Sequence, residues 1–225
     1  FLRLRSKLIR KEQVMRIKRR ISRDGRHKFE RFDDLKSGVI YRRIYCGFAW
    51  PFSAMLGFIC VLAEDHKQDY SLQFGPRHLR ILDEFESSNL EELHRHCRQI
   101  KEEFSLKHIL GIDDTPLYQI WNQSKRPDEK IRLSNPYDFE KITLDLISQL
   151  VRRHTERGYK TLHFGDQSRL PSYLSALTPE EIEEKDITIY PAIAAFGYCL
   201  CEMELRPPVK PSNGWKRRNR SAMVI

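Results

Sequence analysis

Residues 46–63 read CGFAWPFSAMLGFICVLA, an uncharged run of 18 residues between two arginines and two acids. A run of this length reaches the lower limit for a transmembrane helix. However, it contains two glycines and a proline, which interrupt helices, and its aromatic and β-branched residues cluster on both sides of WPFS. We therefore expect two buried strands, at 39–48 and 54–63, and keep a single membrane span as the alternative.

Downstream of this run, strand patterns alternate with helical ones. The apolar residues between 90 and 104 recur at intervals of three and four, which is typical of an amphipathic helix, and Ser88 or Asn89 can cap it. Thr178 and Pro179 likewise form a helix start. The expected elements are strands at 78–85, 107–112 and 160–165, helices at 89–104, 115–123, 137–157 and 190–205, and a loop at 124–136.

The order of these elements predicts an α/β fold with a mixed five-stranded sheet flanked by helices. Three strands come first and can pair antiparallel, whereas the later strands are separated by helices, and such crossovers force strands to run parallel. This is also the layout of a ribonuclease H-like domain. We assign that domain to residues 38–205, a basic helical arm or connector to 1–37, and a basic tail to 206–225.

The two ends of the chain are basic and its centre is acidic. The first 43 residues contain 16 basic and 5 acidic residues, and the last 20 contain 6 basic residues and no acid. Residues 2–21 carry apolar residues near helical spacing, so we expect a basic amphipathic helix that ends at Asp24-Gly25. Basic ends favour contact with nucleic-acid phosphates. The candidates are Arg16, Lys18, Arg19, Arg20, Lys216, Arg217 and Arg218.

The five cysteines form no CxxC pair, and their odd number does not suggest a disulfide framework. We therefore expect an intracellular, reducing compartment, either a host cytoplasm or an organelle matrix. Because the chain begins with Phe1 and shows no signal-peptide pattern, we expect it to be a fragment or a processed form.

Acidic residues follow several of the predicted strands. Glu84 ends the third strand, Asp113 and Asp114 end the fourth, and Asp166 follows the fifth. Because ligands of α/β sheets gather beyond the carboxyl ends of parallel strands, these acids can converge. A converged set would hold Mg²⁺ or Mn²⁺, and two such ions could hydrolyse a phosphodiester. The alternative is that they are ordinary loop residues and helix caps.

Three segments carry a resemblance to a known family. GVIYRRIYCGFAWPFSAMLGFICVLAED, HLRILDEFESSNLEEL and KHILGIDDTPLYQIW resemble the C-terminal nuclease domain of large terminase subunits from tailed bacteriophages. That domain is ribonuclease H-like and cuts DNA during viral genome packaging. The resemblance implies a magnesium-dependent, DNA-binding hydrolase in which Glu84 and Asp113, or Asp114, bind the metal.

Two departures bear on activity. The family's first metal-binding Asp, in a GFDW-like motif, corresponds to Ala49 here, and alanine cannot bind a metal. The family's acid near its final helix has no direct counterpart, so Asp166 or Asp186 would complete the site. The site is therefore either degenerate or altered by substitution. The chain also lacks a GxxxxGK[ST] phosphate loop, so the family's ATPase motor would have to be a partner.

Two functional hypotheses follow. The first is a metal-dependent DNA endonuclease domain of the terminase type, disabled or altered at Ala49, with the ATPase motor or other packaging proteins as partners. The second is a non-catalytic RNA-binding subunit of a large nucleoprotein particle, such as an organellar ribosome, in which a degenerate ribonuclease H-like body is held by basic extensions.

Overall fold

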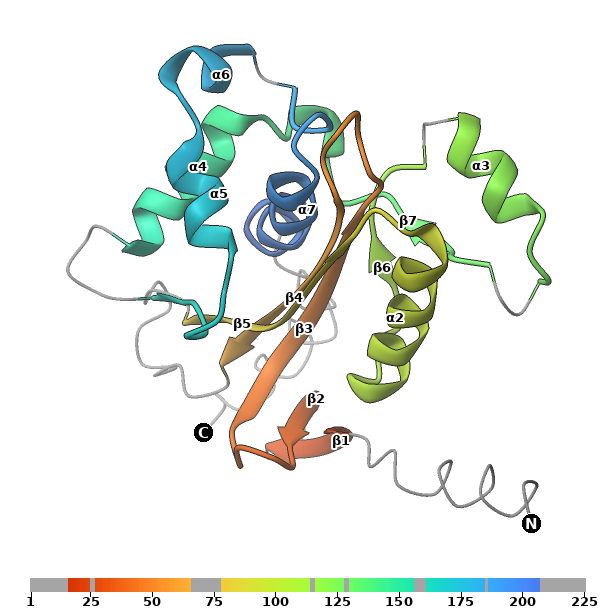
Figure 1. Ribbon diagram of the computed structural model, residues 1–225. Coiled ribbons are helices and arrows are strands. Elements are labelled where there is room, and N and C mark those ends of the chain that lie inside the picture. The colour runs from red at the N-terminus through yellow and green to blue at the C-terminus, as the bar shows by residue number, and fades with distance from the viewer. Residues whose placement is uncertain are drawn as a thin grey trace, which may run out of the picture.

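The computed structural model shows a mixed α/β protein with an eight-stranded mixed sheet and six α-helices in the part of the chain that it describes (Figure 1). This part comprises residues 16–24, 27–65, 78–113, 116–127, 130–155, 161–184 and 186–206.

The strands, in chain order, are β1 (Ile17–Asp24), β2 (His27–Asp34), β3 (Ile40–Ala49), β4 (Gly57–Asp65), β5 (Leu79–Ser87), β6 (Ile109–Leu110), β7 (Leu133–Ser134) and β8 (Leu162–His163). The helices are α2 (Leu90–Glu103), α3 (Pro116–Gln123), α4 (Leu144–Thr155), α5 (Leu170–Ala176), α6 (Pro179–Glu184) and α7 (Pro191–Leu205), with a short 3-10 helix η1 (Phe139–Lys141) before α4.

The centre of the sheet is the antiparallel meander β3-β4-β5, which residues 46–63 help to build. β6 joins the free side of β3 in parallel and β7 joins β6 in parallel, so the central order is β7-β6-β3-β4-β5. β8 adds to β5 in parallel at the other edge. The strands β7, β6, β3, β5 and β8 all run in one direction. β4, between β3 and β5, is antiparallel to them.

The second half of β3 and nearly all of β4 are buried on both faces, which explains the lack of charge in residues 46–63. Figure 1 shows α7 on one side of the sheet and α2 on the other. Side chains at alternating positions follow this division: Cys60 and Leu62 join the core under α7, and Ile59 and Val61 join the core under α2. A strand covered on both faces reads as a continuous apolar run rather than an alternating one.

The sheet and α7 approach each other closely at Gly47. A Cβ atom at this position would lie 1.8 Å from the carbonyl oxygen of Ala195, far inside van der Waals contact. Across the helix, a Cβ at Gly197 would lie 2.4 Å from the side chain of Ile147 on α4. Glycine at both positions therefore allows α7, which is buried from Pro191 to Met203, to lie between β3 and α4.

The structure confirms several elements that were predicted from the sequence. The two strands expected at 39–48 and 54–63 are β3 and β4, and the expected helix at 89–104 is α2. Asn89 caps α2, because its side chain accepts a hydrogen bond from the backbone N–H of Glu91. Thr178 and Glu181 form a reciprocal capping box at the start of α6.

The expected basic helix over 2–21 is wrong for its described part, because residues from Ile17 onward form β1. β1 pairs with β2 in an antiparallel hairpin from Ile17↔Asp34 to Asp24↔His27. Residues 1–15 lie outside the described part of the chain. Asp24 is therefore the last paired residue of a strand and not the end of a helix.

The expected five-stranded sheet is also too small. The hairpin adds two strands, and β7 lies within 124–136, which the sequence indicated as a loop. The helix expected at 137–157 begins at Leu144, after η1. Among the residues that the structure describes, no helix combines the length and the apolar character needed to cross a membrane. The uncharged run is divided between β3 and β4.

Candidate functional site

Ala49 lies at the carboxyl end of β3, on the face covered by α7. Its side chain is 8% exposed and belongs to the apolar cluster that includes Phe58 and Ala195. Gly47, two residues earlier, faces the same helix. A small residue at position 49 therefore has a packing role, because α7 lies so close to this strand.

Glu84 lies on β5, on the same face of the sheet. Its carboxylate accepts hydrogen bonds from the side-chain hydroxyl of Ser168 and from the backbone N–H of Arg169, the latter at 2.8 Å. Arg169 is the N-cap residue of α5. Both oxygens of Glu84 thus take part in fastening the start of α5 to the sheet.

Glu86 makes a second connection between β5 and α5. Its carboxylate pairs with the guanidinium of Arg169 and accepts a hydrogen bond of 2.7 Å from the hydroxyl of Tyr173. The ring of Tyr173 also packs edge-to-face on Phe58 of β4. The two glutamates therefore act together as the attachment of α5.

Asp113 follows β6 and lies on the other side of β3 and β4 from Glu84. The register aligns Glu84 with Cys60, Cys60 with Gly47, and Gly47 with Leu110. Three strand spacings separate Glu84 from Leu110, which places their backbones about 14 Å apart. Asp113 lies three residues beyond Leu110, and its backbone carbonyl accepts a hydrogen bond from the side-chain amide of Gln119 on α3.

The other predicted acids are dispersed. Asp166 is exposed in the turn after β8, where the backbone N–H of Ser168 donates to the carbonyl of Gly165. Asp186 is exposed, and its carboxylate accepts hydrogen bonds from the backbone and the hydroxyl of Thr188. Asp114 lies outside the described residues.

These positions bear on whether the chain can hold Mg²⁺ or Mn²⁺. Across the described ranges, no three His, Cys, Asp or Glu side chains form a group that could hold a metal ion. Both carboxylate oxygens of Glu84 accept hydrogen bonds from residues at the start of α5, and the methyl group of Ala49 cannot act as a metal ligand. The described residues therefore do not fit a two-ion site, and metal binding stays a prediction.

Three arginines in and just before β1 are paired with acids of β2. Arg16 pairs with Asp34 at 3.2 Å and lies over the ring of Phe104, and Arg20 pairs with Asp33 at 2.8 Å. Burial alone would raise the pKa of Asp34, but hydrogen bonds from Arg16 and from the loop backbone outweigh it, so the pKa is lowered. Lys18 is exposed.

Arg19 pairs with Glu30, which Lys107 also contacts at 3.2 Å. The hydrogen bond from Arg19 is the main reason why the pKa of Glu30 is lowered. Two cations thus share one carboxylate, so this cluster keeps a net positive charge. It also joins the hairpin to the segment that follows α2. Lys216, Arg217 and Arg218 lie outside the described residues.

Three exposed cations on α2 continue this cluster. Arg95, Arg98 and Lys101 are spaced three residues apart, so they form one ridge of the helix. None of them pairs with an acid in the part of the chain that the structure describes. The backbone N–H of Leu106 bonds to the carbonyl of Lys101, which brings the chain directly from this ridge to Lys107.

We call this surface the basic face. It consists of Arg19, Arg95, Arg98, Lys101 and Lys107.

The sequence reasoning missed the α2 part of this surface, although the spacing of its three cations on a predicted helix was available as a signal. A scan against protein-family models, a search of curated proteins and a search of solved structures each found no significant match.

Proposed function

We propose that this chain is a ribonuclease H-like domain that binds a nucleic-acid backbone without cutting it, as a non-catalytic subunit of a nucleoprotein particle. The central order β7-β6-β3-β4-β5 supports the scaffold, since one antiparallel strand lies among parallel ones. The connections agree, because α2 joins β5 to β6 and α3 joins β6 to β7.

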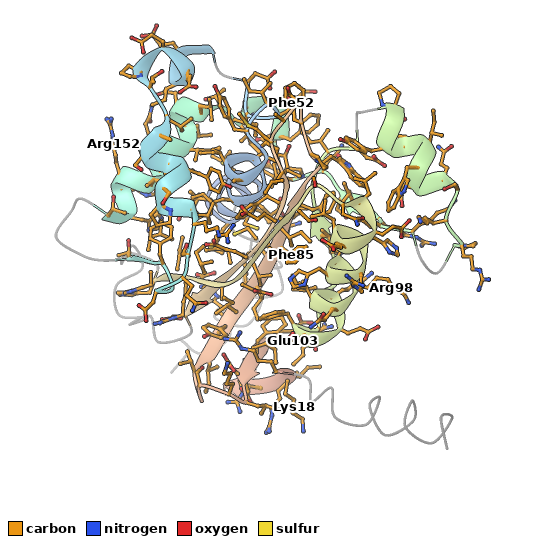
Figure 2. The ribbon with its side chains drawn as sticks, in the orientation of Figure 1. Lys18, Phe52, Phe85, Arg98, Glu103 and Arg152 are labelled. Atoms are coloured by element: carbon orange, nitrogen blue, oxygen red, sulfur yellow. The ribbon has the colours of Figure 1, made fainter. Side chains whose placement is uncertain are left out.

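The proposal is supported chiefly by the excess of positive charge on the basic face. Its five cations are accompanied by three exposed or shared acids, Glu30, Glu91 and Glu102, and Glu91 is itself paired with Lys125, so the surface is net positive. Side chains three residues apart on a helix lie about 5–6 Å from one another, so successive cations can follow a backbone of phosphates. Figure 2 shows Arg98 projecting from α2, away from the sheet.

We propose that the chain does not cut nucleic acid because neither residue 49 nor Glu84 is available to bind a metal ion. The resemblance to terminase nucleases requires a carboxylate at the first position and a metal-binding glutamate at the second. Here the first is a buried methyl group, and the second is used to attach α5. A DNA-cutting function of the terminase type is the competing proposal.

Binding of fluorescein-labelled 30-nucleotide RNA and DNA, followed by anisotropy, tests the proposal. We expect saturable binding whose affinity falls steeply between 50 and 200 mM salt, because each phosphate contact releases counterions. Salt-independent binding, or no binding at 50 mM salt, would contradict it. Comparison of the affinities for the RNA and DNA probes shows which nucleic acid is preferred. Recovery of intact probe after incubation with Mn²⁺ would show that the chain binds it without cutting it.

A further inference from the structure

A groove of about 510 Å³ lies between α4 and the last turn of α7, on the side of the sheet opposite the basic face. Figure 1 shows these two helices beside each other. The volume lies within the range of small-molecule sites. The lining divides into three leucines, Leu146, Leu150 and Leu205, and four polar residues, Gln149, Arg152, Arg153 and Glu204.

The polar wall of the groove is organised by Glu204. Its side chain is 8% exposed, and its carboxylate pairs with Arg153 and with the Nε2 atom of His154 at 3.0 Å. Burial alone would raise the pKa of Glu204, but these two hydrogen bonds outweigh it and lower the pKa to about 2. Glu204 is therefore ionised and fixed in place.

His154 is held by contacts on both sides of its ring. The hydroxyl of Thr161 donates to the backbone carbonyl of His154 at 2.8 Å and lies 2.7 Å from Nδ1. Nε2 lies 3.0 Å from the carboxylate of Glu204. Arg153, on the other oxygen, balances the charge of Glu204.

Arg152 adds a further charge at the edge of the groove. It is exposed and has no ion-pair partner among the residues that the structure describes. In Figure 2 it projects from α4 on the side of the molecule opposite Arg98. The groove therefore combines an apolar floor with an excess of positive charge at one wall.

We propose that this groove binds a small amphiphilic carboxylate, with its alkyl chain on the three leucines and its head group at Arg152. An apolar floor alone would accept a neutral alkane, and guanidinium groups alone would accept a hydrophilic anion. The combination selects a molecule that has both parts, because an arginine pairs with a carboxylate in a bidentate geometry. This inference is independent of nucleic-acid binding.

Isothermal titration of the full chain with decanoate, below its micellar concentration, tests the site. We expect one site per chain, an affinity at least fivefold weaker in Arg152→Gln, and a similar loss in Leu146→Gln, which makes the floor polar. Arg98→Gln removes the same charge from the opposite face and should leave decanoate binding unchanged.

Decanol serves as the neutral probe of the same chain length and should bind at least fivefold more weakly than decanoate. Equal binding of the two probes, equal affinities of the native chain and Arg152→Gln, or loss of binding in Arg98→Gln would each overturn the proposal. Circular dichroism and thermal unfolding of each variant identify a loss of fold; if Arg152→Gln does not fold, Arg152→Ala, which also removes the charge, replaces it with the same expected result.

Discussion

The carboxylate of Glu84 accepts a 2.8 Å hydrogen bond from the backbone N–H of Arg169, so a residue on β5 holds the first turn of α5. Ser168 donates to the other oxygen of the same carboxylate. A glutamate that the sequence indicated as a metal ligand therefore has a structural role in the fold.

Glu84→Ala should lower the free energy of unfolding by about 1–3 kcal/mol, because it leaves two hydrogen-bond donors without their charged acceptor. Denaturant unfolding measures this change, with the exposed Glu140→Ala as a control that should shift it by less than about 0.5 kcal/mol. Thermal unfolding of the native chain should not respond to Mn²⁺. A Mn²⁺-dependent rise that Glu84→Ala abolishes would make Glu84 a metal ligand.

Gly47→Ala should destabilise the protein by about 3 kcal/mol, because the added methyl group would overlap the backbone carbonyl of Ala195. A backbone atom cannot rotate away, so either β3 or α7 must move. Gly165→Ala is the matched control, since a Cβ there meets nothing within 4 Å. Equal unfolding midpoints for the two variants would show that α7 does not lie against β3 as described.

Glu204 should make stability depend on pH in the acidic range. Its pKa falls from 4.5 in the absence of interactions to about 2 in the folded chain, so the folded state favours the ionised form. The resulting stabilisation, on the order of 3 kcal/mol, is present above pH 4.5 and is lost as the pH falls towards 2.

Glu204→Gln should therefore be less stable than the native chain at pH 7, and the difference should shrink between pH 4.5 and 3. Urea unfolding at a series of pH values measures this difference, with the exposed Glu140→Gln as the control. A difference that stays constant over this range would show that ionised Glu204 does not stabilise the fold.

Ala49→Asp should not produce a nuclease. The new carboxylate would enter an apolar cluster under α7, and we expect the free energy of unfolding to fall by about 1–3 kcal/mol. Plasmid DNA and labelled RNA incubated with the variant and Mn²⁺ should remain intact, as they should with the native chain. The exposed Ser175→Asp adds the same charge elsewhere and controls for non-specific effects. Cleavage by Ala49→Asp alone would favour the terminase-type proposal.

The sequence predicted the central strands and helices well because their signals are local. The uncharged run at 46–63 indicated burial, and the interruption at Pro51 divided it into β3 and β4. Asn89 and Thr178 marked the starts of α2 and α6 through hydrogen bonds to residues two or three positions away. Such signals do not depend on the rest of the fold.

The N-terminal hairpin was missed because its pattern is ambiguous. Ile17 and Ile21 are four residues apart, which suits a helix face, but they also lie on one face of a strand. Pairing with β2 decides between the two, and it is not encoded in β1 alone. In the structure Ile17 is buried against the α2 side of the core, whereas Ile21 is 70% exposed.

The candidate site was harder to predict because it depends on distances across the sheet. Ordering the strands shows that β4 and β3 lie between Glu84 and Asp113, and the sequence carries no direct record of that order. The arginines in and just before β1 also form ion pairs with acids of β2. The number of cations in a segment therefore does not tell how many remain available to bind a phosphate. Within the basic face, the cations that pair with no acid in the described part of the chain lie on α2.

The central claim is that the basic face binds a nucleic-acid backbone, and a salt titration of two triple variants tests it most directly. The first variant replaces Arg95, Arg98 and Lys101 by Gln. The control replaces Lys36, Arg126 and Arg152 by Gln, three exposed cations outside the basic face, so both variants lose the same charge. Affinity for the labelled 30-nucleotide probe is measured from 50 to 200 mM salt.

We expect the first variant to bind at least tenfold more weakly at 100 mM salt, and its slope of log affinity against log salt to be shallower by about 2, since three phosphate contacts are lost. The control should stay within twofold of the native chain and keep its slope. Equal losses in the two variants would show that net charge alone governs binding, and would contradict a binding site on α2.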